Sequence, residues 1–440
     1  MKTNNIQLPK YPAYKPSGVE WLGEIPEHWE AVSLGSILEL KSDKNHPEYE
    51  VLSVYREYGV IKKDSRDDNH NATSLDTSNY KAVEPGDLVV NKMKAWQGSM
   101  GVSPHKGIVS PAYITCRVDS EKIHPEYLHQ LLRCDLYIGE YNRLSYGVRV
   151  GQWDMHYEDF KHITTTIPPL SEQTAIANFL DNKTALIDKA ITLKEKQIEL
   201  LKERRQILIH RAVTRGLNPD VKLKDSGVEW IGEIPEGWEV ARVKQFTTKI
   251  SKGTTPSTEG RSILDEGPIR YIKGENIQEG KIIDTPAHFI DEKTNALIRR
   301  SELKENDVLF VIAGATLGKI AIIQKEHIPS NTNQAVAFLR PNSKIIPQYL
   351  AIWLSSKIIT ELIWLEAVQS AQPNLSMENL GNFPIILPEI KEQGLILRTV
   401  ENINSKISTA ISLKEKEIEK LKEYKSVLIN EAVSGKIKVG

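Results

Sequence analysis

The sequence has few cysteines, no long apolar run and no excess of charge of either sign. Its two cysteines, Cys116 and Cys134, cannot form a disulfide framework. No segment approaches the roughly 18 uninterrupted apolar residues of a membrane-spanning helix, and the first residues lack the apolar core of a signal peptide. These absences exclude secreted disulfide-rich and membrane proteins, so we expect a cytoplasmic protein.

The charge balance limits how the chain could bind nucleic acid. Lys and Arg number 57 against 58 Asp and Glu, which gives a net charge of -1. The whole chain therefore exerts no general attraction on a phosphate backbone. Any DNA binding must come from local basic patches.

The composition is that of a globular protein. Of the 440 residues, 40% are hydrophobic and 26% are charged, which excludes disordered and collagen-like chains. At roughly 100 to 200 residues per domain, this length predicts two to four domains.

The chain repeats itself. Residues 17–30 (SGVEWLGEIPEHWE) recur at 226–239 with two differences, and residues 193–203 (LKEKQIELLKE) recur in similar form at 413–423. Both elements occur in the same order, so a signature, a globular stretch and a charged segment are duplicated in tandem. Four tryptophans are expected to anchor the signatures to their globules: Trp21, Trp29, Trp230 and Trp238.

The two globular stretches show mixed secondary-structure patterns. Short β-branched runs such as 87–90 and 307–312 alternate with Gly, Pro, Asn and Asp, which predicts strands. Pro125 and Pro347 each mark the first turn of an expected helix. The fold class is therefore mixed α/β (α+β), with two similar globules. The predicted boundaries are a signature segment at 1–30, a globule at 31–166, a long helix at 167–215, a linker and second signature at 216–239, a globule at 240–386, and a second long helix with the C-terminus at 387–440.

The charged segments have heptad spacing, which is typical of paired helices. The predicted coiled-coil seam consists of Ile187, Ile191, Ile198, Leu201, Leu208, Ile407, Ile411, Ile418, Leu421 and Leu428. We expect the first helix to begin near Ser171, as its N-cap, and to end near Val213. Because the halves are duplicates, a pseudo-twofold axis should relate them. An axis across the helices gives an antiparallel coiled coil and one along them gives a parallel pair; we favour the antiparallel form.

Motifs for catalysis are missing. The glycine-rich segment 314–320 is one residue too short for a phosphate-binding loop and ends in isoleucine. Cys116, His124, His129 and Cys134 allow a zinc interpretation, but they lack the C-x-x-C spacing of strong zinc motifs. Nuclease carboxylate motifs are too degenerate to exclude. The pattern favours a non-catalytic chain without a metal site.

The whole constellation resembles the specificity subunit of a type I restriction–modification system. The most specific marks are Gly18 to Pro26 with their copy from Gly227, and the PPLSEQ run at 168–173 that leads into the first long helix. The second copy, at 387–393, keeps Glu-Gln but lacks the double proline and the serine.

The resemblance implies a division of labour among subunits. Each globule would be a target recognition domain for one half of a bipartite, asymmetric double-stranded DNA site, and the helices would set the spacer. Two modification subunits would dock on the helices and flanking segments and supply S-adenosylmethionine-dependent adenine methylation, while restriction subunits would supply ATP- and Mg-dependent translocation and cleavage. This chain would hold no cofactor.

Basic, amide, hydroxyl and aromatic side chains on glycine-bounded loops are the candidate DNA-binding residues, because Lys and amide groups can bond to base edges. They are Lys62, Lys63, Asn91, Lys92, Lys94, Trp96 and Gln97 in the first globule, and Lys252, Thr254, Thr255, Lys273, Asn276, Thr316, Lys319, Asn333 and Gln334 in the second. Any one of them could instead be a solvated loop residue or a turn-stabilising amide. Two other functions stay open: a fused methyltransferase or nuclease with embedded recognition domains, and a coiled-coil adaptor that binds no DNA.

Overall fold

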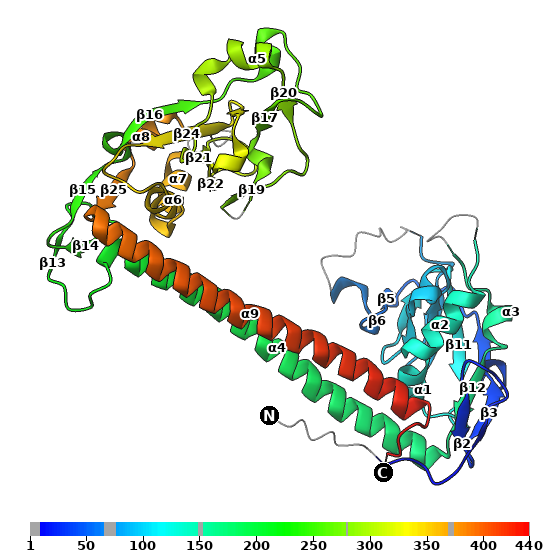
Figure 1. Cartoon of the computed structure of the whole chain (residues 1–440). Helices are drawn as coiled ribbons and strands as arrows, with labels where there is room; N and C mark the ends of the chain where they lie inside the picture. The colour runs from blue at the N-terminus through cyan, green and yellow to red at the C-terminus, as the bar shows by residue number, and fades with distance from the viewer. Residues whose placement is uncertain (1–8, 66–75, 148–152, 279, 368–373, 440) are drawn as a thin grey trace. The chain divides into compact units, whose positions relative to one another are not determined.

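The computed structural model describes residues 9–65, 76–147, 153–278, 280–367 and 374–439. The chain forms two compact units (Figure 1): unit 1 comprises residues 1–195 and 414–440, and unit 2 comprises residues 196–413. Two long helices, α4 (Leu170–Arg215) and α9 (Ile390–Val433), each contribute one part to each unit. None of the helices among the described residues has the length and hydropathy needed to span a membrane.

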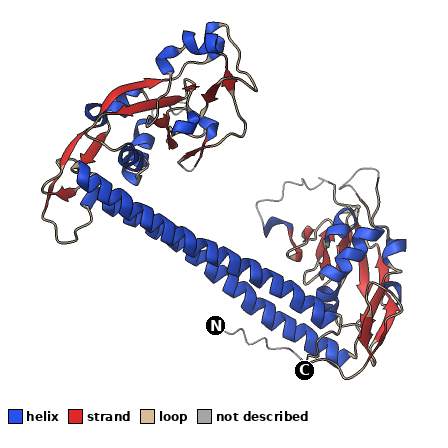
Figure 2. Ribbon diagram, viewed as in Figure 1, coloured by secondary structure: helices blue, strands red, loops and turns tan. Residues whose placement is uncertain are grey.

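Short helices lie beside the sheets of unit 1 (Figure 2). These are α1 (Pro125–Leu132), α2 (Asp135–Leu144) and α3 (Tyr157–Phe160). The strands are β1 (Tyr14–Pro16), β2 (Glu24–Pro26), β3 (Glu30–Ser33), β4 (Leu38–Lys41), β5 (Leu52–Tyr55), β6 (Gly59–Lys62), β7 (Lys81–Val83), β8 (Leu88–Asn91), β9 (Met100–Val102), β10 (Gly107–Val109), β11 (Tyr113–Val118) and β12 (Thr164–Ile167).

Unit 2 repeats this plan with additions. Its short helices are α5 (Glu292–Leu297), α6 (Pro347–Leu354), α7 (Lys357–Ala367) and α8 (Met377–Asn382). Its strands are β13 (Leu223–Asp225), β14 (Glu233–Pro235), β15 (Glu239–Arg242), β16 (Thr247–Lys252), β17 (Ile269–Ile272), β18 (Ile277–Gln278), β19 (Lys281–Ile282), β20 (Phe289–Ile290), β21 (Val308–Val311), β22 (Ile320–Ile322), β23 (Ser330–Thr332), β24 (Val336–Pro341) and β25 (Pro384–Leu387).

Each unit is built on a four-stranded antiparallel sheet. The strand order is β4-β11-β8-β9 in unit 1 and β16-β24-β21-β22 in unit 2. The central strand β21 is apolar throughout because both of its faces are covered: Val308 and Phe310 enter one hydrophobic cluster, and Leu309 and Val311 enter another. The mixed α/β class is confirmed, and the glycine-rich segment 314–320 joins two antiparallel strands.

The Glu-Gln pair at the start of each long helix anchors that helix to its globule. The buried Gln173 amide donates to the carbonyls of Lys122 and Pro168 and accepts from the His124 amide. Gln393 repeats this arrangement with the loop before α6. The glutamine serves both copies because its side chain bonds to main-chain groups, which do not depend on the neighbouring sequence.

The acidic member of each pair holds the signature tryptophan. Trp29 Nε1 donates to Glu172 at 3.2 Å, and Trp238 Nε1 donates to Glu392 at 2.9 Å. Both indoles are buried. Trp230 is 43% exposed, so the expectation that it anchors the second signature is wrong.

The long helices pair in antiparallel fashion within each unit. In unit 1, Lys194 on α4 bonds to Glu417 on α9, and Asp188 bonds to Lys425, so residue numbers rise on one helix as they fall on the other. In unit 2, the C-terminal end of α4 and the N-terminal part of α9 share one core cluster. The antiparallel pairing is therefore confirmed, and the pseudo-twofold relation stays a prediction.

The seam positions face the partner helix. Five of them, Ile187, Ile191, Ile198, Ile407 and Leu428, are buried, and the other five, Leu201, Leu208, Ile411, Ile418 and Leu421, are half-buried. The helix α4 begins at Leu170 and Ser171 is its second residue, so Ser171 is not the N-cap; instead the Pro169 carbonyl accepts the amides of Glu172 and Gln173.

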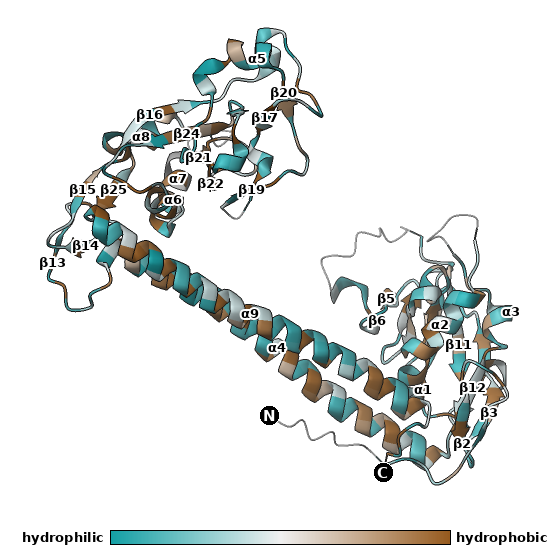
Figure 3. Ribbon diagram, viewed as in Figure 1, coloured by the Kyte–Doolittle hydropathy of each residue, from teal (hydrophilic) through white to brown (hydrophobic). Residues whose placement is uncertain are grey.

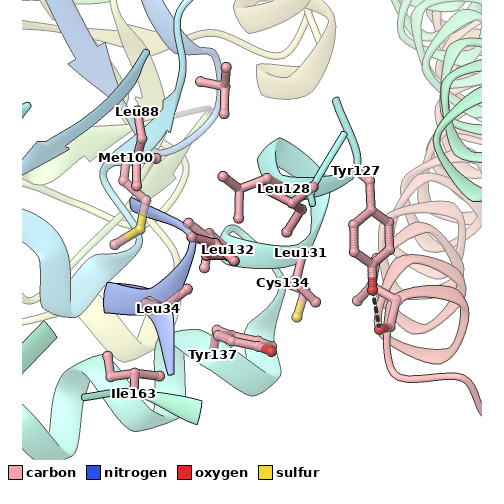
Figure 4. Close-up of a cluster of buried hydrophobic side chains, with 14 of the residues drawn as sticks. Leu34, Leu88, Met100, Tyr127, Leu128, Leu131, Leu132, Cys134, Tyr137 and Ile163 are labelled. Atoms are coloured by element: carbon pink, nitrogen blue, oxygen red, sulfur yellow. Dashed lines mark hydrogen bonds between the residues drawn. The ribbon is translucent and has the colours of Figure 1, made fainter. Parts of the chain in front are cut away.

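The helix α9, which follows the second globule in the chain, ends in the core of unit 1, and α4, which follows the first globule, ends in the core of unit 2. Tyr127 in unit 1 donates its buried hydroxyl to the carbonyl of Val433, the last residue of α9 (Figure 4). In unit 2, Tyr349 is placed in the same way against Val213 of α4. The C-terminal segment continues into unit 1, where Ile437 is buried and the Lys438 amide donates to the Pro9 carbonyl at 2.6 Å.

Candidate nucleic-acid interface

One end of the central sheet in unit 2 gathers most of the DNA-binding residues predicted for the second globule. Strands β16 and β21 are both antiparallel to β24, so they finish at the end of the sheet where β24 begins. We call this end the strand-end face of unit 2. It is formed by Lys252, Thr254, Thr255, Lys273, Thr316, Lys319, Asn333 and Gln334.

Hydrogen bonds between loops hold this face together. The Thr254 amide donates to the Thr332 carbonyl, the Thr332 hydroxyl donates to Ile272 at the end of β17, and the Thr316 hydroxyl donates to Gly274. A Cβ on Gly253 would lie 1.9 Å from the Thr332 oxygen, so this crossing requires glycine. The loops after four strands are therefore fixed against one another.

Within this face, exposure separates candidate readers from supporting groups. The side chains of Lys319 and Gln334 are exposed, while those of Lys252, Thr254 and Asn333 are half-buried. Lys273 is half-buried beside Glu275, with 3.6 Å between Nζ and the carboxylate. Lysine and amide groups at such positions can bond to phosphates and base edges.

Asn276 has a structural role in this fold. It is 3% exposed, its amide nitrogen donates to the carbonyls of Ile283 and Pro286, and its oxygen accepts the Lys273 amide. A side chain enclosed in this way cannot reach a base edge. Including Asn276 among the base readers was therefore wrong, and it is the turn-stabilising amide of the alternative interpretation.

Unit 1 presents the equivalent sheet end with different side chains. Asn91 ends β8 opposite Tyr113, and the 3₁₀ helix η3 (Lys92–Gln97) follows. Lys92 forms an ion pair with Asp154 at 3.1 Å, and Trp96 packs edge-on against Trp153. The side chains of Lys94 and Gln97 are exposed, whereas Asn91 is 9% exposed.

The other two candidates in unit 1 lie on a separate hairpin. Lys62 ends β6, and Lys63 begins the short 3₁₀ helix η2 (Lys63–Ser65). Lys62 forms an ion pair with Glu50 at 2.7 Å. These lysines come from a different element than Asn91, and their place in one set with it stays a prediction.

Sequence reasoning missed two lysines at this sheet end. Lys44 follows β4 and forms a β-bridge with Lys81, and Lys81 donates to the Tyr113 carbonyl at 2.5 Å. Burial, and then the neighbouring charges of Lys44 and Lys92, lower the pKa of Lys81. The two lysines are 37 positions apart in the chain, which hides their proximity, and no glycine-bounded loop pattern marks them.

Buried ion pairs support the sheets behind these faces. Asp87, at the start of β8, binds Lys41 of β4 at 2.6 Å, and Asp307, at the start of β21, binds Arg340 of β24 through both oxygens at 2.8 and 2.7 Å. Each aspartate also accepts a main-chain amide of its own turn. Asp307 raises the pKa of the Arg340 guanidinium.

The four residues of the zinc interpretation do not come together. Among the described residues, no three His, Cys, Asp or Glu side chains are close enough to hold a metal ion. Burial raises the pKa of both thiols, Cys116 and Cys134, to about 12. Burial and the adjacent Arg133 lower the pKa of His129 to about 4, so this imidazole is neutral at pH 7.

The family follows from comparison with known proteins. The family described as "Type I restriction modification DNA specificity domain" matches the chain twice, at residues 26–203 and 235–423. The chain belongs to the type I restriction–modification DNA specificity family. The duplicated match confirms the resemblance and favours a specificity subunit over a fused methyltransferase or nuclease.

Individual relatives agree with this assignment. The type I restriction enzyme MjaVIII specificity subunit of Methanocaldococcus jannaschii is 24% identical over 94% of both chains. The EcoBI specificity subunit of Escherichia coli is 31% identical over 54% of this chain and 50% of its own length. These relatives are specificity subunits, which are non-catalytic, so the prediction that this chain is not an enzyme is confirmed at the level of the family.

Solved structures show the same fold. A chain from a study of complex assembly and conformational transition in the type I R-M system has a TM-score of 0.69 at 15% identity, covering 93% of this chain and 98% of its own. The HsdS subunit from Thermoanaerobacter tengcongensis has a TM-score of 0.55 at 17% identity, with the same coverage.

Proposed function

We propose that this specificity subunit recognises a bipartite, asymmetric site in double-stranded DNA, with one half read by each unit. The observation that carries the proposal is the duplicated sheet end. Each unit has its own four-stranded sheet with polar loops at the equivalent end, but the side chains on these loops differ between the units. A common framework with different contact residues is what reading two different half-sites requires.

We also propose that α4 and α9 set the spacer and, with their flanking segments, dock two modification subunits. Apolar residues recur along both helices (Figure 3). On α4, four of them repeat at seven-residue intervals outside the seam and are 53 to 63% exposed: Leu186, Leu193, Leu200 and Ile207. Exposed apolar residues in heptad spacing favour docking of another helix.

The remaining parts of the proposal concern the partners. S-adenosylmethionine would bind to the modification subunits, and ATP and Mg would bind to the restriction subunits that join them. The chain would act in the cytoplasm, where it meets DNA. Phosphate contacts from the partners would add to the local basic groups of a chain whose net charge is -1.

Exchange of one globule tests the proposal. The chain is reconstituted with its modification subunits, and the methylated sequence is determined by methylome sequencing. Replacing residues 31–166 with the equivalent globule of another family member should change one half-site and preserve the other half and the spacer.

The matched control replaces residues 240–386 and should change the opposite half. A simultaneous change of both halves after either exchange would contradict separate reading. A complex that leaves no sequence-selective footprint would instead favour the coiled-coil adaptor.

A further inference from the structure

Three lysines from separate parts of unit 1 lie at one end of its four-stranded sheet. Lys81, at the start of β7, donates its ammonium to the Tyr113 carbonyl at 2.5 Å. Lys44 is the β-bridge partner of Lys81. Tyr113 pairs with Asn91 across the sheet, which places Lys92 next to the same end. Three chain segments thus bring three positive charges to one place.

Negative charge at this place does not balance them. Lys92 pairs with Asp154 at 3.1 Å. The acidic neighbour of Lys44, Asp43, pairs with His46 at 3.1 Å. Among the described residues, no carboxylate forms an ion pair with Lys44 or Lys81. The cluster therefore carries excess positive charge around a half-buried ammonium.

Such a cluster costs free energy in the unliganded protein. Burial and the repulsion from Lys44 and Lys92 both disfavour the charged form of Lys81, and its pKa is lowered accordingly. A bound anion would offset this repulsion and stabilise the charged form. An ammonium acts as a point charge toward phosphate, so several converging ammoniums suit a phosphate oxygen better than the edge of a base.

The position of the cluster selects the ligand. It lies at the sheet end that carries Asn91 and η3, where unit 2 has its strand-end face. We propose that Lys44, Lys81 and Lys92 bind a phosphate group of the DNA backbone and so orient unit 1 on its half-site. This inference rests on the proposed function, because it takes DNA to be the ligand of this face.

The first test measures binding of the reconstituted complex to DNA as a function of salt. Each lysine that contacts phosphate contributes about one to the slope of log affinity against log salt. The variant Lys44→Gln/Lys81→Gln should lower this slope by one to two, weaken binding to target and non-target duplexes alike, and leave the methylated sequence unchanged.

A matched control lies at the opposite end of the same sheet. Lys122 is 58% exposed and pairs with Asp119, whose amide bonds to Ile37 before β4. The variant Lys122→Gln removes the same charge and should keep the wild-type slope. Lys44 is exposed, so the single variant Lys44→Gln keeps the test valid if Lys81→Gln perturbs folding. Protection of the buried Cys116 and Cys134 thiols from labelling verifies that unit 1 is folded in each variant.

The second test locates the phosphate. Target duplexes carry a neutral methylphosphonate at one backbone position at a time. A methylphosphonate at one position of one half-site should weaken binding of the wild-type complex. The same substitution should weaken binding of the lysine double variant much less, because that variant has already lost the contact.

The possible results separate the two proposals. Suppose that the wild-type complex is selective for its target. If the lysine variants then keep the wild-type salt slope, or if their effect depends on no methylphosphonate position, the phosphate site alone is overturned. A wild-type complex that does not distinguish its target from other duplexes would overturn both proposals.

Discussion

At the scale of single residues, Asp307 shows how unit 2 supports its central strand. Its carboxylate is fully buried, binds Arg340 through both oxygens and accepts the Lys304 amide. Removing one partner of a buried ion pair leaves the other charge without compensation, which is costly. Unit 1 meets the same need with Asp87, but its cation, Lys41, lies on β4, which is separated from β8 by β11, whereas Arg340 lies on the strand directly beside β21.

We expect Asp307→Asn to lower the free energy of unfolding by about 3 kcal/mol, since Arg340 would keep its charge without a carboxylate partner. Urea denaturation of the full chain measures the change. The control removes an exposed pair, by Arg299→Ala beside Glu302, and should have no resolvable effect. Equal stability of Asp307→Asn and wild type would show that the ion pair is unimportant.

His129 predicts acid sensitivity in unit 1. The imidazole contacts Arg133 at 2.5 Å and lies so near Gly59 that a Cβ there would be 2.7 Å from the ring. Burial and Arg133 lower its pKa to about 4, against an ordinary value of about 6.5. As pH falls from 6.5 to 4, the unfolded chain takes up a proton that the folded chain refuses, so stability is lost over that range.

This pKa difference corresponds to about 2 kcal/mol between pH 7 and pH 5. Urea denaturation at both pH values should show that His129→Gln loses that much less stability than wild type, while the exposed His162→Gln behaves as wild type. Parallel losses in all three proteins would show that His129 is not the sensitive group.

At the scale of elements, the segment after α9 completes the core of unit 1. Ile437 is 6% exposed, and Gly435, at a φ of 72°, packs against Pro26 and Trp29. A side chain at Gly435 would meet Pro26 at 2.4 Å. The signature of the first copy therefore depends on residues more than 400 positions away in the chain.

We expect Ile437→Ala to destabilise unit 1 by about 3 kcal/mol through the lost contacts and the cavity. Both cysteines of the chain are buried in this unit, so their labelling rate in urea reports its opening. The variant should label at lower urea concentration than wild type, and exposed Lys436→Ala should not. Unchanged labelling of Ile437→Ala would mean that the segment contributes nothing to the core.

At the scale of the whole molecule, the continuity of α4 and α9 is the basis for the proposed spacer role. The pair Lys194 and Glu417 shows which residues lie opposite each other. Insertion of one heptad after Lys196 and one after Lys416 keeps the seam in register and lengthens both helices by about 10 Å. Roughly three base pairs of duplex cover that length.

The methylome of a host carrying this variant should show the same two half-sites with a spacer about three base pairs longer. Some activity should be lost, because three base pairs rotate the duplex by nearly a third of a turn. Seven residues inserted in the linker after Pro219 serve as the control and should leave the spacer unchanged. An unchanged spacer in the helix variant, with full activity, would show that α4 and α9 do not set the spacer.

Much of the fold could be predicted from the sequence because it depends on local periodicity. The repeated signature marked the duplication, β-branched and apolar runs such as Val308 to Val311 marked strands, and the heptads marked paired helices. The runs and the heptads reflect which side chains of an element are buried, and neighbouring residues in the chain record this directly.

The candidate site could be predicted only in part, because it depends on which strands pair. Loops after β16 and β21 meet through strand order, which explains why residues such as Thr254 and Thr316 gather at one end. Local pattern cannot distinguish the enclosed amide of Asn276 from an exposed one, nor bring Lys44 to Lys81.

The sequence by itself determined the duplication, the kinds of element and the family of the chain. Only the tertiary structure decided that Val433 completes unit 1 and Val213 completes unit 2, and that Lys81 lies at the same sheet end as Lys44 and Lys92. The physical reason is that sequence periodicity records which side of a helix or strand is buried, whereas packing between distant segments decides which elements contact each other.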